Sequence, residues 1–167
     1  MNILEILGIT KAEHEREVLE EFLACLNAKN PLVYELESKE SPEPDVLVIR
    51  PEKEEYYELA RILDYRLVIF RLKALIIRSA IFQVNAATFG LPERDIVKSK
   101  LKKKYTTNSK DLHLLLYYDT GILNGGYPPP EFHNLYNDVI SPLLDDDSIF
   151  QTIYIFDRVS QTILWKN

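Results

Sequence analysis

A continuous apolar run in the second half of the chain most constrains the fold. Residues Leu112–Tyr118 read LHLLLYY and are followed directly by Asp119. A run of this length without polar alternation is typical of a strand that is buried on both faces of a sheet. We therefore expect an α/β domain in which helices flank a mixed central β-sheet, with this run as a central strand.

The size and composition of the chain fit one domain covering residues 1–167. Of its 167 residues, 46% are hydrophobic, which is enough to bury a core without a disulfide or a structural metal. The lone Cys25 excludes a disulfide framework and a cysteine zinc cluster. His14, His113 and His133 lie far apart, without zinc-like spacing. These features predict a protein of the reducing cytoplasm.

Two regions of the chain bear on targeting and membrane insertion. Residues 1–10 lack a basic start and contain Glu5, so they do not resemble a signal peptide. The apolar region 67–89 is interrupted by Arg71, Lys73 and Arg78, whereas a membrane-spanning helix needs about 20 residues nearly free of charge. We expect a soluble protein without a membrane partner.

The charge is unevenly distributed along the chain. The formal net charge is −6, yet residues 66–104 hold 10 basic residues and only two acidic ones, Glu93 and Asp95. Residues 1–65 hold 7 basic and 16 acidic residues. A basic segment of this kind could follow a phosphate backbone, although solvated lysines on a helix surface are an equally ordinary interpretation.

The first part of the chain predicts a helix followed by two short strands. Thr10 and Glu13 have the spacing of a capping box, which opens a helix running to about residue 28. Its apolar stripe leaves Glu15, Glu20 and Glu21 facing outward. Strands are expected over residues 32–36 and 46–49. Residues 51–64 fit either a helix beginning at Pro51 or a turn followed by a strand over 56–62, and the local pattern does not decide between them.

The second half predicts further helices and a closing hairpin. A largely buried helix over 67–85 would form a helical insertion within residues 66–92. A helix over 93–105, a loop over 121–130 and a helix over 131–144 surround the central strand. Two strands over 150–156 and 162–165 would form a C-terminal β-hairpin.

Asp45 and Glu58 form the most informative pair of residues. If the segments that carry them are adjacent strands, their carboxylates meet at one edge of the sheet. Two carboxylates held in this way, with water and a backbone carbonyl, suit Mg²⁺ or Mn²⁺, which activate water for attack on a phosphodiester. The competing interpretation is an acid near a turn and an acid on a helix surface.

At these residues the sequence resembles the PD-(D/E)XK nuclease superfamily, which has the restriction-endonuclease-like fold. The resemblance lies in Pro44 and Asp45 on the second strand, Glu58 on the third, a lysine-rich helix and the buried strand Leu112–Tyr118. It implies an αβββαβ core, a strand rather than a helix at 56–62, and metal-dependent hydrolysis of DNA. Asp45 and Glu58 would then be the catalytic metal ligands.

One departure from the family pattern concerns its lysine. The position two residues after the glutamate, on the same face of the strand, is Ala60, while Arg61 would point to the other face. In such families the lysine can move to the following helix. Helical geometry places Lys104, and next Lys98, beside its core face as substitutes. Lys102 and Lys103 would face solvent, and with Lys100 they are the expected nucleic-acid contacts.

Further roles and alternative functions follow from the same residues. The resemblance implies a supporting acid on the first helix, for which Glu13 and Glu17 are the candidates, although Glu13 also fits a plain capping role. The missing lysine motivates an alternative in which the nuclease-like domain has lost its chemistry and binds nucleic acid or protein. A third alternative is an acidic interaction protein whose segment 67–89 buries a homodimer face.

Overall fold

The structure is a computed structural model that describes residues 10–28, 33–62, 92–107, 111–119, 135–144 and 148–167. The helix expected over 67–85, the homodimer face expected over 67–89 and the loop expected over 121–130 lie outside these residues. The same is true of His133 and of all but the last residue of the insertion expected over 66–92.

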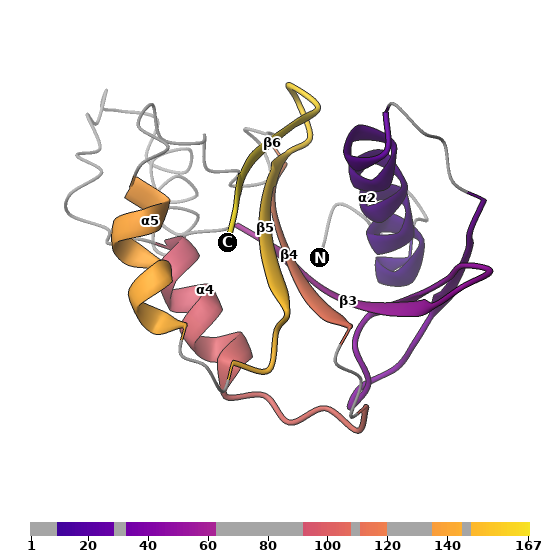
Figure 1. The fold of residues 1–167 in the computed structure, drawn as a ribbon, viewed down its shortest axis with the longest axis horizontal. Helices are drawn as coiled ribbons and strands as arrows, with labels where there is room; N and C mark the ends of the chain where they lie inside the picture. Colours follow the sequence, from indigo (N-terminus) through magenta and orange to yellow (C-terminus); the bar gives the residue numbers. More distant parts are fainter. Residues whose placement is uncertain (1–9, 29–32, 63–91, 108–110, 120–134, 145–147) are drawn as a thin grey trace, which may run out of the picture.

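The described strands form one mixed sheet in the order β1-β2-β3-β4-β5-β6 (Figure 1). β3, β4 and β5 run parallel to one another, and the remaining neighbours are antiparallel. This arrangement confirms the expected α/β class with a mixed central sheet. The strands are β1 (Glu35–Ser38), β2 (Val46–Ile49), β3 (Glu54–Arg61), β4 (Leu112–Tyr118), β5 (Thr152–Asp157) and β6 (Thr162–Lys166).

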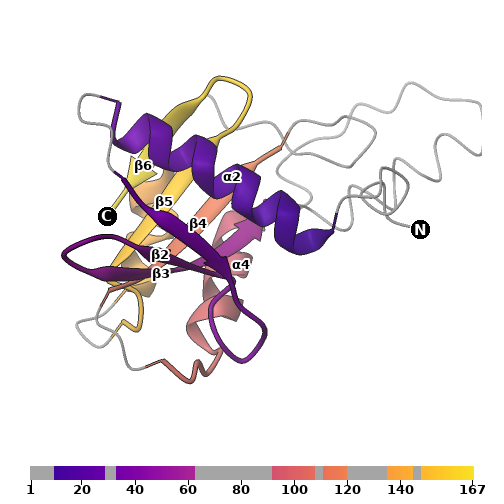
Figure 2. The same cartoon turned by 90° about the vertical axis from the view of Figure 1, so that its right-hand side faces the viewer.

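Helices cover both faces of this sheet. In Figure 2, which turns the molecule by 90°, α2 crosses in front of the strands, while α4 and α5 pack on the opposite side. The helical elements are α2 (Lys11–Leu26), α4 (Pro92–Leu101), α5 (Leu135–Val139) and the short 3₁₀ helix η3 (Ser141–Leu143). Among the described residues, no helix is both long and apolar enough to cross a membrane.

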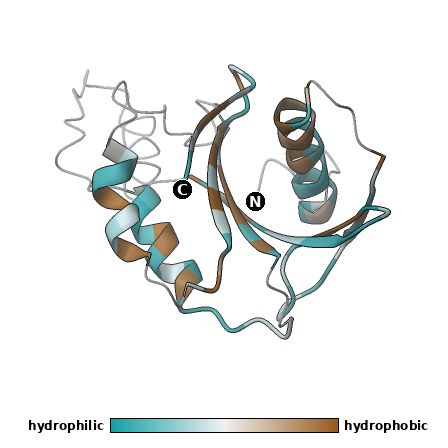
Figure 3. Ribbon diagram, viewed as in Figure 1, coloured by the Kyte–Doolittle hydropathy of each residue, from teal (hydrophilic) through white to brown (hydrophobic). Residues whose placement is uncertain are grey.

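Two apolar clusters hold these layers together. One lies between α2 and the sheet and includes Phe22, Tyr57 and Leu115. The other lies between the sheet and α4 with α5, and includes Val97 and Leu114. Figure 3 shows apolar residues along the strands and on the inner sides of the helices. Because the two faces are covered, all seven residues of β4 are buried, as expected for a central strand.

The ambiguous segment after Pro51 is a strand. β3 pairs antiparallel with β2 and parallel with β4. Its side chains alternate, since Tyr57 and Leu59 pack into the α2 cluster while Tyr56 and Ala60 pack against the α4 cluster. A period of two residues is what a strand between two covered faces requires, so tertiary pairing overrides the helical propensity of this stretch.

The first helix follows its sequence pattern with one exception. The capping box is present, since Thr10 accepts from the Glu13 backbone N–H and Glu13 accepts from Thr10 N. The expectation that Glu15 faces outward is wrong, because its side chain is buried. Glu15, Val18, Leu19 and Phe22 have the i, i+3, i+4, i+7 spacing of one helix face, so Glu15 lies on the buried stripe.

Other boundaries differ from the sequence prediction at element ends. α4 ends at Leu101 rather than at Tyr105, and the chain turns at Lys102. In place of one helix over 131–144 the structure has α5 and then η3, in which Pro142 cannot donate a backbone hydrogen bond. β1 ends at Ser38, two residues later than expected, because Ser38 still pairs with Val46 of β2. The C-terminal hairpin is confirmed.

Candidate functional site

Adjacent strands place Asp45 and Glu58 opposite each other. Val46 pairs with Tyr57 in the antiparallel register of β2 and β3, so Asp45, one residue earlier, faces Glu58, one residue later. Asp45 Oδ2 accepts a hydrogen bond from the Leu59 backbone N–H at 2.8 Å. The carboxylate of Asp45 therefore lies just before the start of β2 and is held by the backbone of β3 at Leu59.

Glu58 is a fully buried carboxylate with two lysine partners. Its relative exposure is 0%, and its Oε1 oxygen accepts from Lys100 Nζ at 2.5 Å and from Lys103 Nζ at 2.9 Å. Lys100 Nζ also lies 3.4 Å from the Leu59 carbonyl oxygen. Glu58 Oε2 is also buried, and the Tyr105 phenol lies close enough to the Glu58 carboxylate to interact with it. The two ammonium groups thus neutralise Oε1, while the phenol is the neighbour that remains for the rest of the carboxylate.

The end of α4 explains why these two lysines reach Glu58. Glu58 and Ala60 share the sheet face that α4 covers, and the small Ala60 side chain carries no cation of its own. Because the helix ends at Leu101, Lys103 does not continue along the helix surface, where regular geometry would place it in solvent. The expectation that Lys103 faces solvent is wrong for this reason, while the exposure expected of Lys102 is confirmed.

The structure distributes the other predicted lysines differently. Lys98 and Lys104, expected to substitute for the missing family lysine, are exposed, and neither contacts Asp45 or Glu58 within the described residues. Lys100 and Lys103, expected to touch nucleic acid, are the two that hold Glu58. The sequence pattern thus placed the end of this helix about four residues too late, and the substitute role of its lysines stays a prediction.

Asp45 is connected to α2 through a third lysine and a third carboxylate. Lys11 Nζ lies 3.3 Å from Asp45 Oδ1 and 3.0 Å from Glu15 Oε1. Burial, together with the charges of Asp45 and Glu58, raises the pKa of Glu15 to about 7 although Lys11 opposes the shift. Burial works against the ammonium of Lys11, yet Asp45 and Glu15 raise the pKa of that group.

The two predicted supporting acids lie elsewhere on α2. Glu13 is exposed and closes the capping box, and its hydrogen bonds with Thr10 lower its pKa. Glu17 is also exposed and lies near His14 and Arg158. The acid of α2 that lies close to the Asp45–Glu58 pair is Glu15, which sequence reasoning missed. Its position on the apolar stripe of the helix was the sequence feature that indicates a buried side chain.

An aromatic residue after α4 lies beside Glu58. The ammonium of Lys103 lies 4.9 Å from the centre of the Tyr105 ring. Burial and the negative charge of Glu58 raise the pKa of the Tyr105 phenol above its ordinary value. The phenol therefore stays protonated at neutral pH and covers the buried carboxylate.

The carboxylates fit a hydrated divalent cation. No group of three or more His, Cys, Asp or Glu residues in the described ranges is arranged to hold a metal ion. Mg²⁺ requires fewer protein ligands than that, because it keeps several waters and is commonly bound through one or two carboxylates. Both lysines are hydrogen-bonded to Oε1 of Glu58, so its Oε2 is not held by an ammonium group, and Asp45 lies opposite Glu58. Asp45 and Glu58 are the residues that could hold such an ion.

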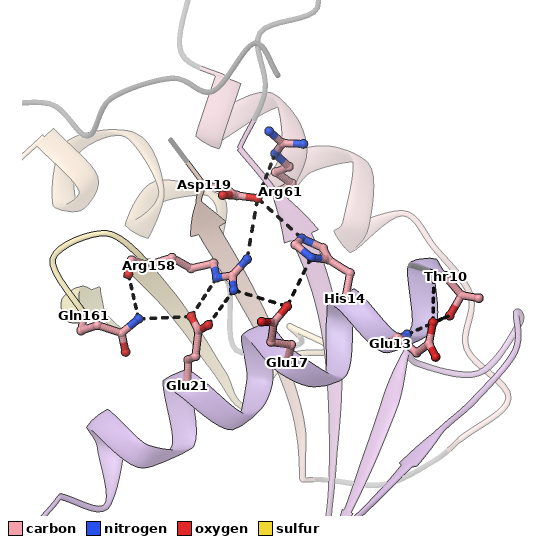
Figure 4. Close-up of polar contacts among 9 residues, drawn as sticks. All are labelled: Thr10, Glu13, His14, Glu17, Glu21, Arg61, Asp119, Arg158 and Gln161. Atoms are coloured by element: carbon pink, nitrogen blue, oxygen red, sulfur yellow. Dashed lines mark hydrogen bonds and ion pairs between the residues drawn. The ribbon is translucent and has the colours of Figure 1, made fainter. Parts of the chain in front are cut away.

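A second charged network fixes α2 over the ends of the parallel strands (Figure 4). Arg158, which follows β5, makes two hydrogen bonds with Glu21 of α2, at 2.8 and 2.6 Å. Asp119, which follows β4, lies within 3.6 to 3.8 Å of His14, Arg61 and Arg158. Arg61 thus points away from Glu58, as expected for a residue three positions further along a strand in which side chains alternate between the two faces. Burial and the charge of Arg158 lower the pKa of His14.

The fold and the site together define an α/β protein with a six-stranded mixed sheet and a lysine-bound pair of carboxylates. Comparison of the chain with family models, with curated proteins and with solved structures found no match.

Proposed function

We propose that this chain is a metal-dependent nuclease of the PD-(D/E)XK type that hydrolyses phosphodiester bonds in DNA. Asp45 and Glu58 would hold Mg²⁺ or Mn²⁺, and Lys100 or Lys103 would replace the lysine that Ala60 lacks. The observation that carries the proposal is the buried Glu58 carboxylate, which lies opposite Asp45 and is contacted by Lys100 of α4 and by Lys103 just after it.

Three features of the described residues support this assignment. The elements from α2 to β4 follow the order αβββαβ that the sequence resemblance implies. Asp45 and Glu58 face each other on adjacent strands rather than at unrelated positions. A cation is present on the sheet face where the family lysine would stand, although it comes from a different element.

The residues of the chain divide the chemical work among them. A bound divalent ion would activate a water molecule and stabilise the charge that develops on the phosphate. Asp45 and Glu58 supply the negative charge that holds the ion. The ammonium groups of Lys100 and Lys103, fixed on Glu58 Oε1, orient the attacking water beside it. Removing a group with this role typically lowers the rate by about 10² to 10⁴.

Glu15 is the supporting acid in this proposal. It is held by Lys11, and burial, together with the charges of Asp45 and Glu58, raises its pKa to about 7. A nearby cation would favour its ionised form, so Glu15 would become charged when the ion binds. It would thereby add a full third negative charge near the site once the ion is bound, whereas at neutral pH it is only partly ionised in the metal-free protein.

The test is cleavage of plasmid DNA by the purified chain with Mn²⁺ or Mg²⁺. Asp45→Asn and Glu58→Gln should abolish cleavage, and both should weaken Mn²⁺ binding measured by calorimetry in the absence of DNA. Glu54→Gln is the matched control, because Glu54 is an exposed acid on the same strand. Unchanged cleavage or Mn²⁺ binding in the Asp45 and Glu58 variants, with thermal melting showing a folded protein, would refute the assignment.

A second candidate function keeps the fold without the chemistry. Lys11, Lys100 and Lys103 contact the three carboxylates of the site, so ammonium groups already neutralise these acids without a metal ion. This observation favours a module that binds DNA but does not cleave it. DNA retention that is sensitive to salt and independent of Mn²⁺, with no cleavage product, would identify this second function.

A further inference from the structure

Lys11 stands at the open side of the carboxylate pair. Its side chain has a relative exposure of 76%, although its ammonium contacts Glu15 and Asp45 at 3.0 and 3.3 Å. An ammonium group has three donors. Two of them are directed at these acids, and the third is available to an anion from solvent. The acids therefore fix the position of the cation without enclosing it.

The other face of the sheet carries its own exposed cations. Lys98, Lys102 and Lys104 are exposed on or just after α4, whereas Lys100 and Lys103 are turned toward Glu58. α2 and α4 pack on opposite faces of the sheet (Figure 1). The Asp45–Glu58 pair consequently lies between Lys11 on one side and three exposed lysines on the other.

We propose that Lys11 contacts a backbone phosphate of the nucleic acid, and that the strand crosses the Asp45–Glu58 pair between Lys11 and the exposed lysines of α4. This inference rests on the proposed function. An anion that reaches both groups of cations has to extend across the sheet edge, so the ligand is a polymer of phosphodiesters rather than a single phosphate. Affinity then comes mainly from phosphate neutralisation and falls with salt.

Binding of a labelled DNA duplex to the full chain in EDTA tests this inference without cleavage. Fluorescence anisotropy between about 50 and 200 mM NaCl gives the slope of log K against log salt, which changes by about 0.9 for each phosphate contact. Lys11→Gln should reduce the magnitude of that slope by about 0.9. Lys11→Arg should retain it. Lys53→Gln is the matched control, since Lys53 is also exposed and paired with a glutamate, at the far end of β3.

The double variant Lys11→Gln/Glu15→Gln separates a direct contact from a change in the local field. At about pH 9, where Glu15 with its pKa of about 7 is ionised, it removes one charge of each sign, so a pure field effect is compensated while a phosphate contact is still lost. A slope still reduced by about 0.9 in this variant supports the contact. A slope restored to the wild-type value, or an unchanged slope in Lys11→Gln alone, overturns it.

The outcomes distinguish this inference from the proposed function. If the wild-type chain binds the duplex but never cleaves it with Mn²⁺, and Lys11→Gln reduces the slope, the catalytic proposal fails and the Lys11 contact stands. If the chain cleaves DNA and Lys11→Gln behaves like the wild type, the proposed function stands and the Lys11 contact fails. Absence of any salt-dependent binding overturns the Lys11 contact directly.

Discussion

Replacing Lys100 and Lys103 with methionine measures how much these two ammonium groups stabilise the buried charge of Glu58. A hydrogen bond to a charged group contributes about 1.5–3 kcal/mol, but each lysine lies within 2.9 Å of the same oxygen, so either can compensate for loss of the other. We therefore expect each single variant to lose about 1 kcal/mol of unfolding free energy. The double variant leaves a fully buried, unpaired carboxylate and should lose about 3–5 kcal/mol. The double variant should therefore lose more unfolding free energy than the two single variants lose together.

Urea denaturation at neutral pH measures these losses, and a Glu58→Gln background supplies the control. Without the carboxylate, the same lysine substitutions no longer strand a buried charge and should cost little. The reasoning is refuted if the double loss equals the sum of the single losses and is the same with Gln at position 58. That result would mean that the lysines contribute by packing their aliphatic chains against the sheet rather than by neutralising Glu58.

Three further predictions concern the rest of the structure. The pKa of Glu15 is raised from 4.5 to about 7, so its contribution to stability is present below about pH 4.5 and lost as the pH rises through 7. Relative to Glu15→Gln, the wild type should lose about 3 kcal/mol of unfolding free energy across this window, measured by urea titrations. Burial lowers the pKa of His113, so acid should destabilise the protein as the pH falls below about 6.5, and His113→Phe should reduce that dependence in thermal melts at stepwise pH. Arg158→Met should cost about 1–3 kcal/mol by losing the paired hydrogen bonds to Glu21, and equal melting of variant and wild type would contradict this role.

The sheet was predictable because its signals are local. The apolar run of β4 and the short apolar run of β2 each match the strand found in the structure to within a residue. The capping box at Thr10 likewise marks the start of α2. β3 was undecided because its alternating pattern, with two tyrosines between acids, also fits a helix that begins at Pro51. Only its neighbours on both sides make it a strand.

The candidate site was predictable in part. The pairing of Asp45 with Glu58 follows from the spacing of two strands joined by a short turn, in which Arg50 N donates to Lys53 O. The choice of lysine depends on where α4 ends, and helix ends are the least reliable feature of a sequence pattern. Glu15 was missed because a carboxylate was assumed to face solvent even though its position lies on the apolar stripe of α2.

The partners of Glu58 distinguish it from the other buried acid of β3. Glu55 is also buried, but its closest partners, Arg50 and Lys53 at 2.7 Å, lie within five residues of it, across the turn that joins β2 to β3, while His113 of β4 lies further away at 3.8 Å. That cluster stabilises a local hairpin. Lys100 and Lys103 lie 42 and 45 residues from Glu58, in the last turn of α4 and just after it, where the chain could have packed apolar residues alone.

Apolar packing at Glu58 would also have been favourable, because replacing a buried ion pair with well-packed hydrophobic residues is often neutral or stabilising by about 1–4 kcal/mol. Folding alone therefore gives no reason for a carboxylate at position 58 or for two distant lysines on one of its oxygens. The hydrolysis proposed at Asp45 and Glu58 would give such a reason, since it requires charged groups held in fixed positions. The proposed function would therefore account for the arrangement of Asp45, Glu58, Lys100 and Lys103, which apolar packing does not require.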